Sequence, residues 1–326
     1  FGAKARIQYQ PKGVIGVISP WNFPVNLTFT PLAGVFAAGN RTMIKPSEFT
    51  ERTSELMKQL FAEYYSEEEV AVVTGGPDVG AAFSKLAFDH LLFTGATSIA
   101  YHVMRAAADN LVPLTLELGG KSPNLVFADC DLEERVTQSV ADCMFNTGQS
   151  CDAPTRLLVE RSCYDEVVEI ARRAVEGTAV GNPEEEGDHI GPLFDQIQFD
   201  RVQNMIQVGI DEGANLIAGG MGRPEGIEAG WFVQPTIFAD VNNTMRIARE
   251  EIFGPVLAII PFDTEEEAVE IANDTPYGLA AYLQTGSPGR AARLSRSLRA
   301  GAVHINGGAY EYGSPFGGYK ASGNGR

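Results

Sequence analysis

Short apolar runs alternate with segments of helical character along the first third of the chain. Runs rich in β-branched and other apolar residues, which are typical of buried strands, fall at 13–18, 41–45, 70–74, 90–94 and 114–117. Helices are predicted between them over 25–38, 52–65 and 95–108, the first ending at Gly39-Asn40. This alternation of strands and helices predicts a parallel sheet with right-handed crossovers.

The alternation resumes after Pro123 with a second set of elements. Strands are predicted over 124–127, 156–160, 215–218, 231–238, 256–261 and 301–305, and helices over 132–145, 164–175, 198–212, 265–273 and 289–298. A loop rich in Gly, Pro and acidic residues covers 181–192. We therefore predict an α/β protein with one domain over 1–119, a second over 120–318 and a Gly-rich end over 319–326.

Composition and charge narrow the class of protein. The chain has 326 residues, of which 44% are hydrophobic, as expected for a globular protein, and a formal charge of −17. The negative charge argues against nucleic acid and anionic membranes as partners. We find no apolar run of transmembrane length and no signal-type segment near the start.

The cysteines argue against disulfides and zinc. Cys130, Cys143, Cys151 and Cys163 form no C-x-x-C pair, and none of the four histidines lies near a cysteine at zinc spacing. We therefore expect no metal, free thiols, and a reducing, cytoplasmic location.

Two residues are the main candidates for chemistry. Cys151 follows Gly148, Gln149 and Ser150, so little side-chain bulk blocks approach to its thiol, although a buried structural thiol is the equal alternative. Glu117 ends a predicted strand just before a Gly-Gly pair, where it could act as a base or remain a surface or capping residue. A thiolate nucleophile and a carboxylate base in one pocket would be sufficient for covalent catalysis.

Other candidates lie at the ends of predicted strands, where ligands bind in parallel sheets. They are Lys45, Glu48, Gly75, Gly76, Thr94, Gly95 and Glu117. The turn over 75–80 resembles a phosphate-binding loop without the dinucleotide fingerprint, and a plain turn explains it equally well. Glu48 could bind ribose hydroxyls or cap a helix, and Asn22, between two prolines, could donate to an oxyanion or stabilise its own loop.

Seven segments in one order resemble the NAD(P)-dependent aldehyde dehydrogenase superfamily, from Ile7 to the last residue. The segments are Pro20-Trp21-Asn22-Phe23-Pro24, Lys45-Pro46-Ser47-Glu48, Phe93-Thr94-Gly95-Ala96-Thr97, Glu117-Leu118-Gly119-Gly120-Lys121-Ser122-Pro123, Gly148-Gln149-Ser150-Cys151, Glu250-Glu251-Ile252-Phe253-Gly254-Pro255-Val256 and Pro315-Phe316-Gly317-Gly318-Tyr319-Lys320. The part before Lys121 is most similar to coniferyl aldehyde dehydrogenases, and the part after Cys151 to general aldehyde dehydrogenases.

The resemblance implies a Rossmann-like cofactor domain over 1–119 and a catalytic domain over 120–318, with the start of an oligomerisation segment over 319–326. Cys151 would attack the aldehyde, Asn22 and the Cys151 backbone N–H would hold the oxyanion, and Glu117 would activate water to hydrolyse the thioester. The partners implied are a small-molecule aldehyde, aromatic or aliphatic, and a second or further copies of the chain in a homodimer or homotetramer.

NAD or NADP is the implied cofactor. NAD is favoured, because the Glu48 carboxylate would repel the 2′-phosphate of NADP. The cofactor-binding residues implied are Trp21, Lys45, Glu48, Gly76, Gly80, Phe93, Thr94, Gly95, Ser98, Leu118, Gly119, Glu251 and Phe253. The implied aldehyde tunnel is lined by Phe23, Phe145, Ser150, Asp152 and Phe316. For the three phenylalanines, ordinary core packing is the equal alternative.

The chain departs from the family pattern at both ends, and two other functions stay open. The family has a longer N-terminal region and continues beyond the final Gly-Arg, so we expect unpaired sheet edges and exposed apolar surface. The alternatives are a CoA-acylating enzyme, which would generally lack the glutamate at position 117, and a truncated, catalytically silent NAD-binding or assembly module.

Overall fold

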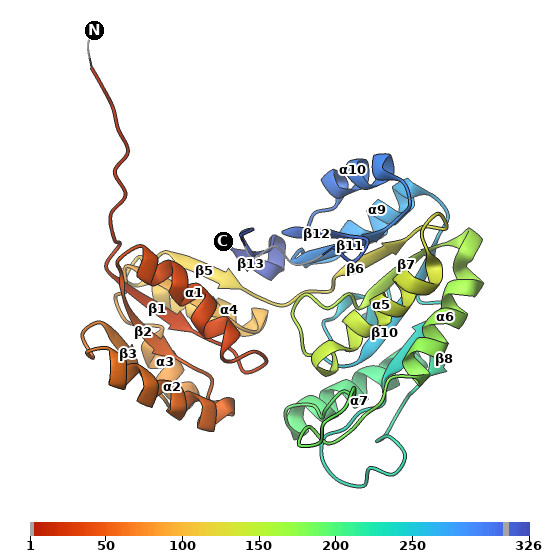
Figure 1. Ribbon diagram of the computed structural model, residues 1–326, viewed down its shortest axis with the longest axis horizontal. Helices are drawn as coiled ribbons and strands as arrows, with labels where there is room; N and C mark the ends of the chain where they lie inside the picture. The colour runs from red at the N-terminus through yellow and green to blue at the C-terminus, as the bar shows by residue number, and fades with distance from the viewer. Residues whose placement is uncertain (1–2, 309–312) are drawn as a thin grey trace. The chain divides into compact units, whose positions relative to one another are not determined.

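The computed structural model describes residues 3–308 and 313–326, and the chain divides into two compact units (Figure 1). The first unit comprises residues up to Leu118 together with Gly325. The second begins at Gly119 and includes residues to Asn324 together with Arg326. The division falls between Leu118 and Gly119, at the start of the Gly-Gly pair. Each unit is an α/β structure and is described by itself.

The first unit is built on a parallel sheet in which five strands run in the order β5-β4-β1-β2-β3. Its strands are β1 (Val14–Ile18), β2 (Arg41–Lys45), β3 (Val70–Val72), β4 (His90–Thr94) and β5 (Leu114–Glu117). Its helices are α1 (Asn26–Ala37), η1 (Glu48–Thr50), α2 (Glu51–Tyr64), α3 (Pro77–Phe83) and α4 (Thr97–Ala108). The predicted parallel sheet with helical crossovers is confirmed.

Both faces of this sheet are covered, which explains why its strands read as nearly continuous apolar runs. One core cluster joins Leu91 and Leu116 of the sheet to Val103 of α4, and α3 adds Phe83. The other cluster joins Val17 and Ile44 to Leu32 of α1 and Phe61 of α2. The helix pairs α1/α2 and α3/α4 therefore pack on opposite faces.

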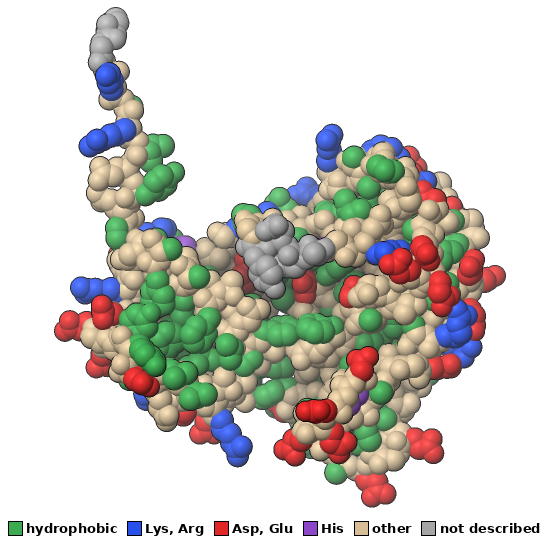
Figure 2. All heavy atoms as spheres, viewed as in Figure 1, with side chains coloured by type: hydrophobic (Ala, Val, Ile, Leu, Met, Phe, Trp, Pro, Cys, Tyr) green, Lys and Arg blue, Asp and Glu red, His purple; other side chains and the backbone are tan. Residues whose placement is uncertain are grey.

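Apolar side chains also gather on the surface of the first unit, over α1 and α2 (Figure 2). Phe29, Leu60 and Tyr64 are exposed there, and with their neighbours they line an open groove of about 570 Å³. An exposed apolar surface was expected from the sequence. Such a patch is typical of a surface that another segment or chain covers.

The second unit has a seven-stranded sheet in the order β12-β11-β6-β7-β10-β9-β8, parallel except for the antiparallel pair β8–β9. Its strands are β6 (Pro123–Val126), β7 (Arg156–Glu160), β8 (Asn215–Ala218), β9 (Thr236–Ala239), β10 (Val256–Phe262), β11 (Ala280–Gln284) and β12 (Ala302–Ile305), followed by the short β13 (Gly323–Asn324). Its helices are α5 (Leu132–Met144), η2 (Phe145–Gly148), η3 (Arg161–Cys163), α6 (Tyr164–Glu176), α7 (Gln196–Asp211), α8 (Arg246–Arg249), α9 (Glu265–Asn273), α10 (Pro288–Ser297) and η4 (Lys320–Ser322). None of the helices in the described part of the chain combines the length and apolar character that a bilayer-spanning helix needs.

Three features differ from the sequence prediction. The strand predicted over 231–238 begins only at Thr236, because Pro235 has no N–H to donate to a ladder. The strand β11 was not predicted, since its two alanines have weak strand propensity, yet it lies between β6 and β12. The turn predicted over 75–80 ends early, because Pro77 opens α3 at a position where proline favours helix initiation.

Two basic side chains of the second unit, Arg156 and Lys121, are buried. Arg156 is fully buried and donates to the carbonyl oxygens of Lys121, Ile271 and Ala272, each at 3.0 Å, and to the Asn243 side chain. Burial lowers the pKa of Arg156 to about 10, so the guanidinium stays charged at neutral pH. It therefore ties the entry of β6 to the end of α9.

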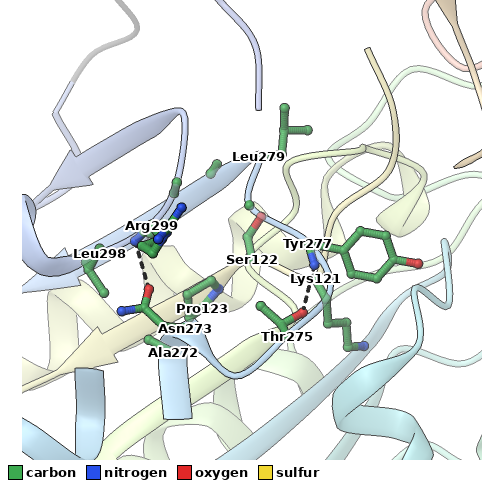
Figure 3. Close-up of a pocket in the computed structure, with 14 residues that line it drawn as sticks. Lys121, Ser122, Pro123, Ala272, Asn273, Thr275, Tyr277, Leu279, Leu298 and Arg299 are labelled. Carbon is green, nitrogen blue, oxygen red and sulfur yellow. Dashed lines mark hydrogen bonds between the residues drawn. The ribbon is translucent and has the colours of Figure 1, made fainter. Parts of the chain in front are cut away.

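The second buried basic group is the Lys121 amine. Its Nζ has no hydrogen-bond partner among the described residues. Burial, reinforced by the charge of Arg156, lowers the pKa of Lys121 to about 7. Figure 3 shows Lys121 and Tyr277 on the side of a small cavity away from Leu298 and Arg299. With about 10 Å³, the cavity has room for one water molecule at most.

The titration of Lys121 makes the stability of the fold depend on pH. Its pKa in the folded chain, about 7, lies below the ordinary value of roughly 10.4, so the unfolded chain binds more protons between these limits. Stability should therefore rise with pH above 7. In urea unfolding, the free energy of unfolding of the wild type should rise by about 2 kcal/mol relative to that of Lys121→Met between pH 7 and pH 9. The exposed Lys58→Met is the control, and parallel pH profiles for wild type and Lys121→Met would contradict the assignment.

Candidate active site

Lys45 and Glu48 form an ion pair at the end of β2. The Lys45 side chain is buried, and its Nζ lies 2.5 Å from Oε2 of Glu48. Ser47 caps η1, since its hydroxyl accepts the N–H of Phe49 at 3.3 Å, and Glu48 is the first residue of that helical turn. The capping role considered for Glu48 thus belongs to Ser47, and the Glu48 carboxylate is held by Lys45.

A cleft of about 330 Å³ lies beside this ion pair in the first unit. It is lined by Pro46, Ser47, Glu48, Glu51, Ser54, Glu55, Thr74, Gly75 and Gly76. Gly75 has a φ of 146°, and a Cβ there would lie 2.5 Å from Val79, so only glycine fits. Gly76 caps α3, which contains Gly80. The lining carboxylates suit hydroxyl groups and disfavour an additional phosphate.

Two further strand ends meet at the same edge of the first sheet. Thr94 and Glu117 are register partners at the ends of β4 and β5, and the Gly95 N–H donates to the Glu117 carbonyl oxygen at 3.0 Å. Phe93 is buried, and Ser98 is exposed in the first turn of α4.

The loop after β1 carries three more candidates, Trp21, Asn22 and Phe23, all half-buried. Since Ile18 of β1 pairs with Lys45 and Phe93, this loop starts at the same edge of the sheet. Leu118 is buried at the end of the unit. The first unit therefore gathers at one sheet edge the residues that the sequence placed at strand ends.

In the second unit, the segment before Cys151 has an unusual backbone. Asn146, Thr147 and Gly148 have φ values of 50°, 58° and 70°, three consecutive residues in the left-handed region. This conformation costs roughly 1–2 kcal/mol for each non-glycine residue. Strained backbone of this kind is concentrated at functional sites.

Contacts from two other segments hold this left-handed run. The Thr147 hydroxyl donates to the Gly191 carbonyl oxygen at 3.0 Å, and a Cβ on Gly148 would lie 2.1 Å from the Gly254 carbonyl oxygen. Gln149 accepts the Phe194 N–H at 2.9 Å and donates to the Asn146 carbonyl oxygen at 3.1 Å. Sequence reasoning did not assign a role to the Gln149 side chain, whose partner lies 45 residues away.

Cys151 lies in a turn that begins two residues after this run. The Ala153 N–H donates to the Ser150 carbonyl oxygen at 3.3 Å, which places Cys151 and Asp152 at the centre of the turn. The Ser150 hydroxyl donates to Oδ1 of Asp152 at 2.6 Å. Cys151 is half-buried, so part of its surface is accessible.

The other three cysteines differ from Cys151 in their surroundings. Burial raises the pKa of Cys130 and Cys163 to about 11 each and that of Cys143 to about 12. Cys143 and Cys163 are also buried side chains of a core cluster. A thiol with a raised pKa is a poor nucleophile at neutral pH, so these three fit structural roles.

The Gly119-Gly120 pair packs against Glu251. The Gly120 N–H donates to Oε1 of Glu251 at 3.0 Å, and a Cβ on Gly119 would lie 2.1 Å from Oε2. Burial raises the pKa of Glu251, whereas the Gly120 N–H and the charges of Arg201 and Lys121 oppose the rise. Phe253, two residues on, has a φ of 60° and is half-buried.

None of the three phenylalanines predicted for the tunnel lies in the core. Phe145 opens η2 and is 61% exposed, and Phe23 and Phe316 are half-buried in the first and second units. Core packing, the alternative left open by the sequence, is therefore excluded for Phe145. Ser150 and Asp152 flank the thiol within the turn.

The chain matches the aldehyde dehydrogenase family model over residues 2–326. It is 47% identical to a 3-succinoylsemialdehyde-pyridine dehydrogenase from a Pseudomonas species, covering 98% of this chain and 68% of the relative. It is 46% identical to a probable coniferyl aldehyde dehydrogenase from Caulobacter vibrioides, covering 94% of this chain and 63% of the relative. The chain thus spans about two thirds of the length of the relatives that it matches.

Solved structures give the same result. A cysteine-to-alanine mutant of aldehyde dehydrogenase C from Pseudomonas syringae, in complex with NAD+ and octanal, superimposes with a TM-score of 0.95 at 42% identity, covering 97% of this chain and 66% of that one. The Mycobacterium tuberculosis aldehyde dehydrogenase in complex with NAD+ superimposes with a TM-score of 0.93 at 45% identity, with the same coverage. On sequence and fold together, this chain belongs to the aldehyde dehydrogenase family.

Proposed function

We propose that this protein oxidises an aldehyde to a carboxylic acid with NAD, using Cys151 as the nucleophile. The observation that carries the proposal is the turn at Cys151, where a half-buried thiol follows three left-handed residues held by contacts from distant segments. The other three cysteines have raised pKa values and fit structural roles. Family membership supports the same assignment.

In the first half of the reaction, the Cys151 thiolate attacks the aldehyde carbon and forms a thiohemiacetal. The Asn22 side-chain amide and the Cys151 backbone N–H stabilise the oxyanion, and one such donor contributes about 3 kcal/mol to lowering the barrier. Bound NAD would supply the acceptor for the hydride that leaves the thiohemiacetal carbon. The acyl group then remains on Cys151 as a thioester.

The residues of each unit fit the chemistry of NAD. In the first unit, Lys45 and Glu48 are held beside a cleft whose carboxylates can accept hydrogen bonds from the adenosine ribose hydroxyls. The same carboxylates disfavour a 2′-phosphate, so we expect NAD over NADP. In the second unit, Glu251 is held by Gly120 and is assigned to the nicotinamide ribose, with Phe253 nearby.

Further cofactor contacts follow from the family resemblance. They involve Trp21, Gly76, Gly80, Phe93, Thr94, Gly95, Ser98, Leu118 and Gly119. Several of these are glycines or lie at the carboxyl edge of the first sheet, where backbone groups are accessible to a ligand. The structures of related enzymes solved with NAD+ support the choice of cofactor.

In the second half of the reaction, Glu117 takes a proton from water, which attacks the thioester and releases the acid and the Cys151 thiol. The presence of Glu117 argues against a CoA-acylating enzyme, which would generally lack this carboxylate. Adding CoA and assaying for acyl-CoA distinguishes the two reactions.

The substrate is proposed to be an apolar aldehyde, aromatic or aliphatic. Phe23, Phe145 and Phe316 are available to line its path, since none of them is buried in a core. Relatives are named for a pyridine semialdehyde and for coniferyl aldehyde, and a neighbouring structure holds octanal. From the family resemblance we also expect a homodimer or homotetramer and a cytoplasmic location.

A silent NAD-binding or assembly module is the second candidate, because the chain spans about two thirds of the length of its relatives. Calorimetry that detects NAD binding by a well-folded sample without turnover of any aldehyde would favour it. Turnover would exclude it.

Replacing the nucleophile tests the proposal directly. Wild type should form NADH, read at 340 nm, with members of a panel of aromatic and aliphatic aldehydes, and more slowly with NADP. Cys151→Ala should lose this activity by about a thousandfold or more, since no other group can carry the acyl intermediate. Cys130→Ala is the matched control and should keep the activity. Turnover of Cys151→Ala at the wild-type rate would contradict the assignment.

Replacing the base should separate the two halves of the reaction. Glu117→Gln should still release NADH in its first turnover, because Cys151 and the oxyanion donors remain, while steady-state turnover falls by roughly a hundredfold. Stopped-flow absorbance resolves the burst from the slow phase. The exposed Glu63→Gln should show wild-type kinetics. Equal loss of burst and steady state in Glu117→Gln would place the residue outside deacylation.

A further inference from the structure

We propose that Tyr282 is a positioning residue for the nucleophile, because its hydroxyl holds the turn that carries Cys151. The Tyr282 hydroxyl donates to the backbone carbonyl oxygen of Asp152 at 3.1 Å. Asp152 directly follows Cys151, and Tyr282 lies on β11, 130 residues further along the chain. The inference rests on the proposed function, in which Cys151 attacks the aldehyde.

The ring of Tyr282 is fixed by its neighbour in the sheet. Tyr282 on β11 and His304 on β12 are register partners, and their rings stack with centroids 4.9 Å apart and planes inclined by 22°. Stacked cross-strand partners restrict the side-chain rotamer. The hydroxyl therefore projects toward the turn from a rigid base.

The hydroxyl remains a donor throughout the physiological pH range. Burial raises the pKa of Tyr282 far above its ordinary value, and the nearby charges of Asp152 and Asp142 add to the rise. A phenol that keeps its proton can donate a hydrogen bond but cannot become a competing anion beside the thiol.

The other side of the turn is limited by Gly120. A Cβ at this position would lie 2.4 Å from the Cys151 carbonyl oxygen, so the glycine allows the turn to lie directly against the backbone. The turn itself is closed by a long hydrogen bond of 3.3 Å from the Ala153 N–H to the Ser150 carbonyl oxygen. Of the two consecutive carbonyl groups of Cys151 and Asp152, that of Asp152 accepts the Tyr282 hydroxyl and that of Cys151 lies close against Gly120.

This arrangement sets the direction of both reactive groups of Cys151. The thiol and the backbone N–H belong to Cys151, whose carbonyl lies close against Gly120 and whose neighbour, Asp152, has its carbonyl bonded to Tyr282. If the anchor is removed, the Asp152 peptide can rotate and the thiol samples more orientations. Misplacement of a nucleophile lowers the rate of the chemical step more than the affinity for substrate.

The test compares Tyr282→Phe with Tyr164→Phe. Tyr282→Phe keeps the stacked ring and removes only the hydroxyl. Tyr164→Phe removes another half-buried phenol of the same unit, one that bonds Asp240 and has no part in the proposed site. Two readouts are needed: alkylation of each cysteine by iodoacetamide, followed by peptide mass spectrometry, and steady-state oxidation of an accepted aldehyde.

In Tyr282→Phe we expect alkylation of Cys151 to rise by about threefold or more, because the released turn exposes the thiol more often, and kcat to fall by about three- to tenfold with KM within twofold. Alkylation of Cys143, which is fully buried, should not change and reports on general unfolding. Tyr164→Phe should match wild type in all four quantities.

Three results would overturn the inference. One is alkylation of Cys151 in Tyr282→Phe that is no greater than in the wild type. Another is an equal rise in the alkylation of Cys143 and Cys151, which would mean only a loosened fold. The third is unchanged kcat in an active enzyme. If wild type oxidises no aldehyde, the proposed function fails, but the alkylation ratio of Cys151 to Cys143 still decides whether Tyr282 holds the turn.

Discussion

The candidate site of the second unit depends on the close packing that Gly119 and Gly120 allow, because neither residue has a Cβ. One glycine leaves room for the Glu251 carboxylate, and the other leaves room for the Cys151 carbonyl group. The same pair has its backbone fixed, since the Gly119 carbonyl oxygen accepts the Ser322 hydroxyl at 2.7 Å. A methyl group at either position would push apart two of the segments that the family motifs mark.

The fold could be predicted largely from local pattern, because its strands are apolar runs buried on both faces and its helices end at recognisable residues. The strand predictions are wrong where local strand propensity and burial disagree. The central strand β11 contains Ala280 and Ala281, which fit tight packing between neighbours but carry little strand propensity. The predicted start of β9 is wrong because the apolar residues before Pro235, of which Val233 is buried and Trp231 and Phe232 are half-buried, do not pair in a ladder.

The site could be predicted only in part, because motifs name residue types and not the contacts that hold them. Cys151, Glu117 and Glu251 are candidates that their sequence segments name, whereas the contacts of Gln149 and Tyr282 depend on partners 45 and 130 residues away. The sequence does not predict the left-handed conformation of Asn146 and Thr147, because Asn tolerates this conformation readily whereas Thr does not. Tertiary contacts override the local preference there.

The left-handed backbone at Asn146 and Thr147 is stabilised by hydrogen bonds to distant parts of the second unit. Two non-glycine residues in the left-handed region raise the energy of the folded state by a few kcal/mol, a cost of the size that a handful of hydrogen bonds offsets. Thr147, Gln149 and Tyr282 supply such bonds from different directions. A turn held in this way loses little entropy when a substrate binds, so binding energy remains available for the transition state. The strain is therefore consistent with a nucleophile whose orientation is set before the aldehyde arrives.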